Sequence, residues 1–123
     1  MKRRDILLSG AGMLAAPAVW AQSQSPWPNR AIRIIVPFGL GGAADVAARF
    51  IAEPLSVALG VPVIIENRTG GNAIIAANAL LQAPRDGYTF LVDAANQLTN
   101  PALMRDIPFD YATAFTPTTL ISV

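Results

Sequence analysis

The sequence predicts an α/β fold in which an open, mostly parallel sheet is flanked by helices. Three apolar, β-branched runs alternate with two segments in which apolar residues recur at helical spacing. A glycine-rich or polar segment follows each run. This alternation is typical of a parallel sheet built from right-handed crossovers. In chain order we expect a strand at 32–36, a helix at 43–59, a strand at 61–67, a helix at 73–82 and a strand at 88–92.

Each expected element has a local reason. Ile32–Val36 is almost entirely β-branched, which is typical of a strand buried on both faces. Gly60 directly follows the first amphipathic segment and is expected to end that helix. Asn72 is expected to cap the second helix. Residues 93–103 are expected to form a polar loop with one helical turn, and Phe115–Val123 a fourth strand.

The first residues read as an export signal. Positively charged "MKRR" precedes the short apolar segment "ILLSGAGMLAA", and "VWA" ends in a small residue, so we expect cleavage after Ala21. The apolar segment is shorter than the ~20 residues that span a bilayer. Arg3 and Arg4 leave the general secretory and twin-arginine routes both open. Residues 1–21 are therefore expected to direct the protein to the periplasm, and 22–30 to form a polar leader arm.

Composition excludes several classes of function. The sequence contains no cysteine and no histidine, so disulfides, Ser-His-Asp triads and histidine-ligated zinc are absent from these 123 residues. Removal of residues 1–21 leaves six basic and seven acidic residues, a net charge of −1. Without a basic patch, nucleic-acid binding is not expected. We expect no cofactor and no metal.

Three loops are predicted to meet where a ligand would bind. In an open parallel sheet, ligands lie beyond the carboxyl ends of the strands, and here the loops at that edge are 37–44, 68–72 and 93–99. The first runs into a helix, whose first N–H groups have no internal partner and can hold an anion. Because that loop contains no lysine or arginine, it suits a small carboxylate better than a phosphate-rich ligand.

The glycine loop also permits an enzymatic interpretation. Gly39-x-Gly41-x-x-Ala44 satisfies the loose dinucleotide-binding pattern, and Glu66 stands where a ribose-binding acid is expected. Pro37 and Phe38 make the bend longer and bulkier than the tight turn of that motif, and export removes the chain from the cytoplasmic nicotinamide pool. An exported NAD(P)-binding oxidoreductase fragment therefore stays the alternative, beside a non-functional remnant of a disrupted gene.

Five segments together resemble one known family. They are "WPNRAIRIIVPFGLGGAADVAAR", "LGVPVIIENRTGGN", "APRDGYTFLV", "TNPAL" and "IPFDYATAFTPTTLI", in the family's order and spacing. The sequence resembles the N-terminal part of the tripartite tricarboxylate transporter substrate-binding proteins, the Bug family of periplasmic receptors. This resemblance implies part of lobe 1 of a type II periplasmic-binding-protein fold. It implies a non-enzymatic receptor that captures a small carboxylate, such as a di- or tricarboxylate, for membrane transporter subunits or a sensor.

The resemblance also implies a site and a domain boundary. Family members are longer, so we expect residues 31–123 to form an incomplete N-terminal lobe, with the second lobe absent and carboxylate binding by this chain alone weak. Leu40 and Ala44 depart from the family's usual proline and threonine. The ligand-binding residues expected from the three loops are Pro37, Phe38, Gly39, Gly41, Gly42, Ala43, Ala44, Asp45, Gly71, Asn72, Ala94, Ala95, Asn96 and Gln97.

Overall fold

A computed structural model describes residues 26–121 of the protein. The predicted signal at 1–21 and the first part of the leader arm lie outside the described residues, so these two assignments stay predictions. Within the described residues, no helix is both long and apolar enough to cross a lipid bilayer. The elements are β1 (Ile32–Val36), α1 (Ala43–Leu59), β2 (Val63–Asn67), the 3-10 helix η1 (Gly71–Ala73), α2 (Ile74–Leu81), β3 (Thr89–Leu91), α3 (Asn96–Leu103) and α4 (Tyr111–Ala114).

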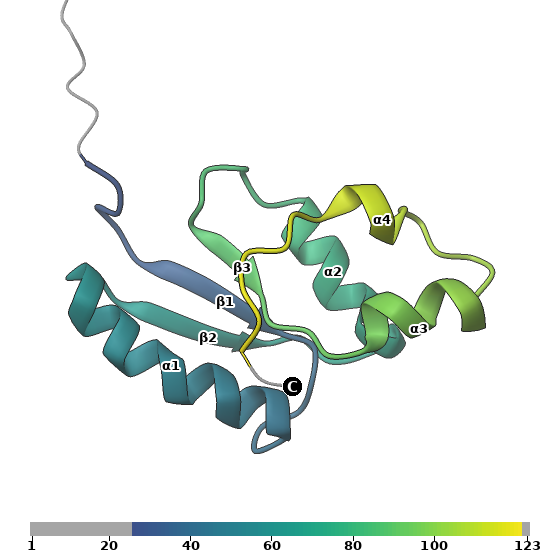
Figure 1. The fold of residues 1–123 in the computed structure, drawn as a ribbon, viewed down its shortest axis with the longest axis horizontal. Coiled ribbons are helices and arrows are strands. Elements are labelled where there is room, and N and C mark those ends of the chain that lie inside the picture. Colours follow the sequence, from purple (N-terminus) through teal and green to yellow (C-terminus); the bar gives the residue numbers. More distant parts are fainter. Residues whose placement is uncertain (1–25, 122–123) are drawn as a thin grey trace, which may run out of the picture.

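The three strands form one parallel sheet in the order β2-β1-β3 (Figure 1). In the central strand, Ile34 lies opposite Ile65 of β2 and Phe90 of β3. The two crossovers run in opposite directions across the sheet, so right-handed connections place α1 and α2 on opposite faces. The predicted α/β class is confirmed, and all three strands end at the same edge.

The core lies on both faces of β1. On one face, Ile34 and Val36 pack with Ala48 of α1, and all three are buried. Ile35 points to the opposite face, because successive side chains of a strand alternate, and α2 contributes the buried Ala76 and Ala77. Alanines at the helix surface let each helix approach the sheet closely. The position of the loop edge is therefore fixed by a small core around the central strand.

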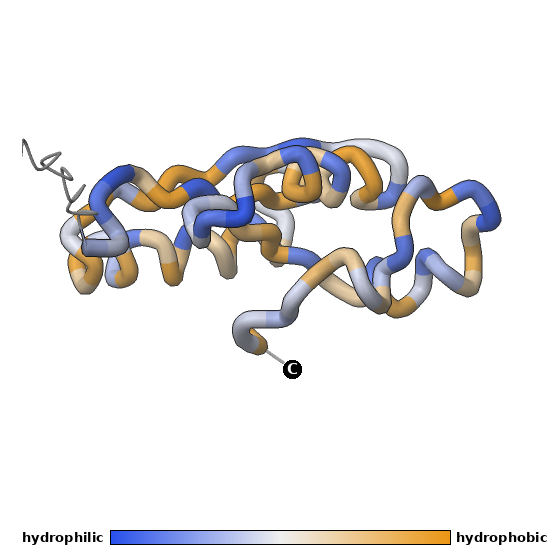
Figure 2. Tube along the Cα trace, turned by 90° about the horizontal axis from the view of Figure 1, so that it is seen from above, coloured by the Kyte–Doolittle hydropathy of each residue, from blue (hydrophilic) through white to orange (hydrophobic). Residues whose placement is uncertain are grey.

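The predicted fourth strand is wrong for the residues that the structure describes. Residues 115–121 follow α4 without pairing to a strand, and their side chains are largely exposed. Figure 2 shows this segment leaving the layer formed by the rest of the chain. Pro117 has no N–H group to donate to a ladder, and β3 offers a free edge of only three residues, Thr89–Leu91. The composition of this segment favours a strand, but the sheet offers no strand edge long enough for it to pair with.

The polar segment after β3 is more helical than predicted. We expected one helical turn in residues 93–103, whereas α3 spans Asn96–Leu103 and includes Pro101 in its interior. Asparagine and threonine have low helix propensity, so the sequence pattern underestimates this helix. Hydrogen bonds from its buried Asn100 to neighbouring elements stabilise α3 despite this low helix propensity.

The leader arm is docked at the opposite edge from the three loops. The Asn29 backbone N–H donates to the Tyr88 hydroxyl at 3.0 Å, and the Arg30 guanidinium stacks 4.0 Å from the centre of the Tyr88 ring. Arg30 also pairs with Asp86, and the Trp27 ring packs against Tyr88 with 6.0 Å between ring centroids. These contacts hold residues 27–30 against the amino end of β3.

Candidate functional site

The candidate site is the edge where the three parallel strands end. β1 leads into the first loop, 37–42, β2 into the second, 68–73, which includes η1, and β3 into the third, 92–95. The expected convergence of these loops is confirmed by the parallel register. Any group bound beyond this edge would meet the start of α1, the start of η1 and the start of α3.

The first loop exposes backbone donors at the start of α1. Gly41 has a φ of 78°, which only glycine adopts readily, and Gly42 is the N-cap in an extended conformation. No side chain caps this helix. The Gly42 N–H turns back to the Gly39 carbonyl at 3.2 Å. The first-turn N–H groups, beginning with Ala43, therefore have no N-cap side chain as acceptor and carry the positive end of the helix dipole.

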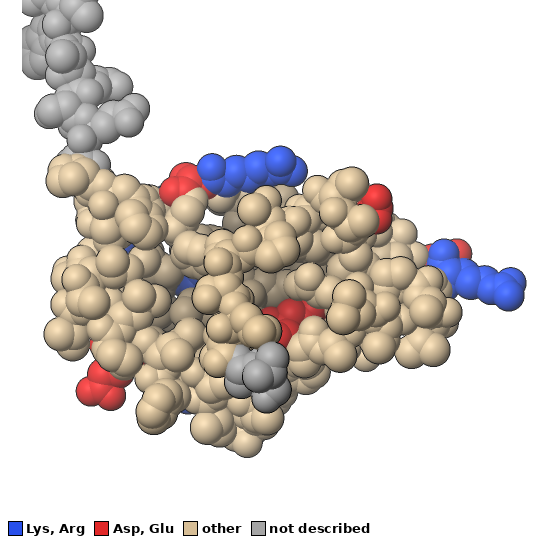
Figure 3. Space-filling model, in the orientation of Figure 1, with Lys and Arg blue, Asp and Glu red and all other residues tan. Residues whose placement is uncertain are grey.

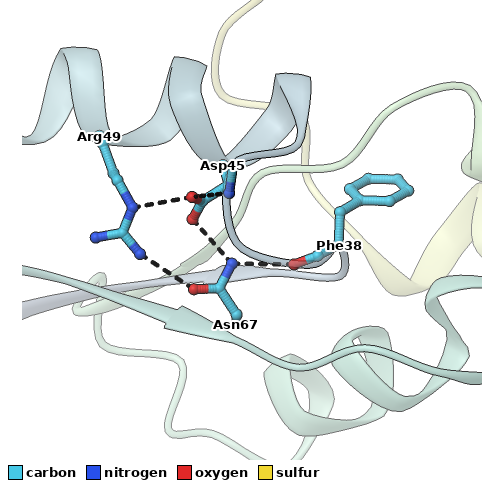
Figure 4. A network of polar contacts seen from close by, with 5 residues as sticks. Phe38, Asp45, Arg49 and Asn67 are labelled. Atoms are coloured by element: carbon cyan, nitrogen blue, oxygen red, sulfur yellow. Dashed lines mark hydrogen bonds and ion pairs between the residues drawn. The ribbon is translucent and has the colours of Figure 1, made fainter.

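Asp45 is occupied by the protein's own donors. Its carboxylate accepts hydrogen bonds from the Gly41 N–H at 2.9 Å, from Arg49 Nε at 3.0 Å and from Asn67 Nδ2 at 2.8 Å. Asn67 also donates to the Phe38 carbonyl, and its own carbonyl accepts from Arg49 (Figure 4). The network joins the first loop, α1 and the end of β2, and the Asp45 side chain is 3% exposed.

The electrostatic role of Asp45 follows from these partners. The hydrogen bond from Arg49, followed by those from Gly41 and Asn67, holds the pKa of Asp45 well below its usual range, although burial acts in the opposite direction. The carboxylate is thus ionised and compensated inside the loop. Arg49, whose Nε lies 3.0 Å from the carboxylate, partly balances this negative charge and so lowers the repulsion that an anion at the start of α1 would meet.

The second loop has an unusual backbone. Gly70 and Gly71 have φ values of 116° and 56°, and the two residues that follow, Asn72 and Ala73, also have positive φ values of 52° and 74°. A left-handed conformation costs free energy at Ala73, because its Cβ crowds the backbone. Such a run persists only where surrounding contacts hold it in place.

An amide network supplies those contacts. Asn72 Nδ2 donates to the Asn100 side-chain carbonyl, and Asn100 Nδ2 donates to the Asn72 backbone carbonyl at 2.8 Å and to the Tyr111 hydroxyl at 2.8 Å. Asn96 Nδ2 donates to the Asn72 side-chain carbonyl at 2.9 Å. Asn100 is fully buried. The network joins the second loop to α3 and α4, so the expectation that Asn72 caps α2 is wrong: its side chain faces α3 instead.

A hollow of about 1030 Å³ lies beside the first and third loops. Ala43 and Ala44 line it from the start of α1, Asp93 and Ala94 from the third loop, and Gln97 from the start of α3. The space-filling view shows acidic atoms inside this hollow (Figure 3), and Asp93 is the acidic residue among its described lining residues. The segment 114–121 forms part of the wall.

The structure divides the predicted site residues into three groups. Ala43, Ala44, Ala94, Ala95 and Gln97 line the hollow together. Pro37 and Phe38 belong to the buried base of the first loop, whereas Gly39 and Gly41 are exposed and Gly42 is half-buried. Asn72 and Asn96 belong to the amide network, Gly71 is the first residue of η1 beside it, and Asp45 belongs to the network of the first loop.

Sequence reasoning missed the residues that hold the loops. Asn67, Arg49, Asn100 and Tyr111 were not expected to matter, although Asn67 ends a strand and Asn100 stands in the "TNPAL" segment of the family resemblance. Of these four residues, Asn100 and Tyr111 are buried, whereas Asn67 is half-buried and Arg49 is exposed. Asp93, at the end of β3, was included only as the first residue of a loop.

The Glu66 carboxylate is already paired within the chain, whereas a ribose-binding acid needs an available carboxylate. Its carboxylate lies 3.3 Å from Arg33 and also accepts a hydrogen bond from the Arg68 side chain. Arg33 and Arg68 would thus compete with a ribose hydroxyl for the carboxylate on which the dinucleotide-binding interpretation depends. No three residues of the metal-ligating types His, Cys, Asp and Glu gather into a metal site between residues 26 and 121.

Comparison with known proteins identifies the family. The tripartite tricarboxylate transporter family receptor profile matches residues 47–122. A UPF0065 protein of Bordetella bronchiseptica is 44% identical over 108 residues, which cover 87% of this chain and 32% of that protein. BugT of Bordetella pertussis is 35% identical over 118 residues, covering 94% and 35%. The chain spans about a third of the length of these curated relatives.

Solved structures agree with this result. Rpa4515 of R. palustris with adipate superimposes with a TM-score of 0.66 at 39% identity, covering 71% of this chain and 29% of that chain. MatC of Rhodopseudomonas palustris with bound malate gives 0.69 at 33% identity, covering 73% and 31%. The matching profile is that of a transporter receptor family, which contradicts the oxidoreductase alternative. The chain belongs to the tripartite tricarboxylate transporter receptor family, whose members are solute-binding receptors and not enzymes.

Proposed function

We propose that the protein containing this chain is a periplasmic receptor that captures a small carboxylate and presents it to a membrane transporter. The chain supplies one wall of the binding cleft. The observation that carries the proposal is the uncapped start of α1 beside the hollow, in a family whose solved relatives include structures with adipate and malate. Residues 1–21 would direct its export.

The first loop suits a carboxylate because its charge is already balanced internally. Asp45 is paired with Arg49, and the exposed N–H groups that begin with Ala43 are left for a ligand. Backbone donors at a helix start bind anions through partial charges and hydrogen bonds. The loop lacks the lysine or arginine that usually binds a phosphate-rich ligand. We therefore expect the first loop to bind a single carboxylate group of the ligand.

Capture would also require closure around the ligand. Binding energy that is realised only when a second wall covers the hollow shifts the population toward a closed form, which a transporter can recognise. The second wall belongs to the whole receptor, and its contribution is part of the proposal. Binding is therefore best measured on the complete product of the reading frame that contains this sequence.

Removal of one backbone donor tests the anion site. Ala43 is the first residue of α1, where proline is tolerated because its missing N–H has no helical partner. Gly42 before it has φ −70° and ψ 161°, a conformation compatible with a following proline. Ala43→Pro is expected to weaken malate or adipate binding about tenfold or more, since a charge-assisted hydrogen bond contributes about 1.5–3 kcal/mol. Isothermal titration calorimetry measures this.

Ala43→Ser is the matched control, because it keeps the N–H group and changes the side chain at the same position. It should bind the carboxylates within about twofold of the parent protein. Both variants should unfold at the parent's temperature, since the helix is retained. Unchanged carboxylate affinity in Ala43→Pro would contradict this site, and binding of NADH with no carboxylate binding would contradict the receptor function itself.

A further inference from the structure

The outer face of α1 is apolar, although the opposite face of the same helix already packs on the sheet. Ala48 and Ala52 are buried on the side that contacts β1 and β2. On the side turned away from the sheet, Val46, Phe50 and Val57 are 54%, 82% and 80% exposed. In Figure 1, α1 lies at the margin of the fold. A helix that is apolar on both faces is normally buried, so we expect another surface to cover this one.

The exposed residues of this outer face form two neighbouring ridges along α1. Residues four apart in a helix lie next to each other on its surface. The first ridge is Val46, Phe50 and Pro54, and the second is Arg49, Glu53 and Val57, all of them exposed. Ridges with this spacing fit into the grooves between the equivalent ridges of another helix, which is the commonest mode of helix packing. The outer face of α1 therefore has the relief of a helix-packing surface.

The charges on the outer face indicate what kind of helix fits it. Glu53 forms no ion pair with any residue between 26 and 121. Suppose that two α1 helices pack antiparallel about a twofold axis that passes between Phe50 and Glu53. Arg49 of each copy then comes near Glu53 of the other, and Val46 comes near Val57. A symmetric dimer requires a surface that is complementary to itself in this way.

We propose that the outer face of α1 is a self-association surface, through which two copies of the receptor pack α1 against α1 in a symmetric dimer. A mostly apolar hollow of about 430 Å³ lies beside the second ridge, between α1 and β2, and Val57 and Pro62 are among its lining residues. This hollow gives the exposed Phe50 ring of the other copy a place to pack.

The dimer is expected to be weak. One helix face buries less than the roughly 800 Å² per partner of a standard interface, so the dimer should form in a concentration-dependent way. Phe50 and Glu53 belong neither to the network of the first loop nor to the amide network. The inference is therefore independent of the carboxylate site, and it adds an assembly state to the proposed receptor function.

Sedimentation velocity of the complete receptor over the micromolar range tests the proposal. The parent is expected to shift from monomer to dimer as its concentration rises. Phe50→Ser is expected to raise the dissociation constant of the dimer about tenfold or more, because a symmetric interface loses the ring twice. Glu53→Arg is expected to raise it by a similar factor, because it places a like charge near Arg49 of the other copy.

Each variant has a matched control outside the outer face of α1. Leu103→Ser makes a comparable change at a residue of α3 that is 74% exposed, and Asp106→Arg reverses an exposed charge between α3 and α4. Both controls should dimerise as the parent does. All four variants should keep the parent's melting temperature at concentrations where the receptor is monomeric, because each altered side chain is exposed.

Two results would overturn the proposal. One is a receptor that stays monomeric throughout the micromolar range. If Phe50→Ser, but not Leu103→Ser, then abolished transport, the face would belong to a transporter subunit rather than to a second copy. The other is a dimer that neither Phe50→Ser nor Glu53→Arg weakens, which would place the dimer interface elsewhere on the receptor. Carboxylate binding by the same samples reports separately on the proposed function.

Discussion

Replacing Asn100 with alanine is expected to lower the free energy of unfolding by about 2–4 kcal/mol. Asn100 is fully buried and bonds to the Asn72 side chain, the Asn72 backbone carbonyl and the Tyr111 hydroxyl. Truncation leaves these groups without that partner and leaves a cavity. It also releases the second loop, where Asn72 and Ala73 adopt left-handed conformations only because they are held there.

Urea unfolding followed by circular dichroism measures the loss of stability. Asn78→Ala on α2 is the matched control, because the Asn78 side chain makes no hydrogen bond with any residue the structure describes and alanine favours a helix. It should leave stability nearly unchanged. If Asn100→Ala were as stable as the Asn78 variant, the amide network would have no role in holding the second loop.

Replacing Asp45 with alanine is expected to lower the melting temperature by about 5–10 °C near neutral pH. The change leaves the Gly41 N–H and the Asn67 amide without the acceptor they use, and leaves Arg49 without its ion-pair partner. Because the first loop is held by this network, carboxylate binding at the start of α1 should weaken as well.

The same variant should alter the dependence of stability on pH. The pKa of Asp45 in the folded chain lies below its value of about 3.9 in an unfolded chain. The ionised carboxylate therefore adds stability that is complete above about pH 4 and is lost as the pH falls through the folded-state pKa. Melting curves from about pH 2 to pH 7 should show this acid-dependent component in the parent and in Asp106→Ala, but not in Asp45→Ala. An identical acid profile in Asp45→Ala would contradict the role assigned to Asp45.

The layers of the fold could be predicted because local patterns and tertiary structure agree. The β-branched run Ile32–Val36 and the amphipathic segment Ala43–Leu59 have the same bounds in the structure as in the prediction. The disagreements arise where tertiary contacts overrule propensity. α3 is stabilised by a buried asparagine, and residues 115–121 lack a strand to pair with.

The candidate site was predictable only in part. Parallel strands oblige the three loops to meet, so their convergence could be expected from the order of elements alone. The order of elements does not reveal which polar side chains contact the ligand and which hold the loops in place. Asp45 stands in the first turn of α1 and Asn72 in the second loop, but they are engaged by residues 22 and 28 positions away in sequence, Asn67 and Asn100. Such pairings depend on packing that no local pattern encodes.

The docked leader arm has a practical consequence for spectroscopy. Trp20 and Trp27 are the tryptophans of the sequence, and Trp20 lies in the predicted signal. Trp27 rests on Tyr88 at the amino edge of the sheet, away from the three loops. Emission from Trp27 would therefore follow detachment of the arm and unfolding of the sheet, while staying insensitive to a solute that arrives at the carboxyl edge. Quenching of the Trp27 emission by a solute would indicate movement of the arm, not occupancy of the site.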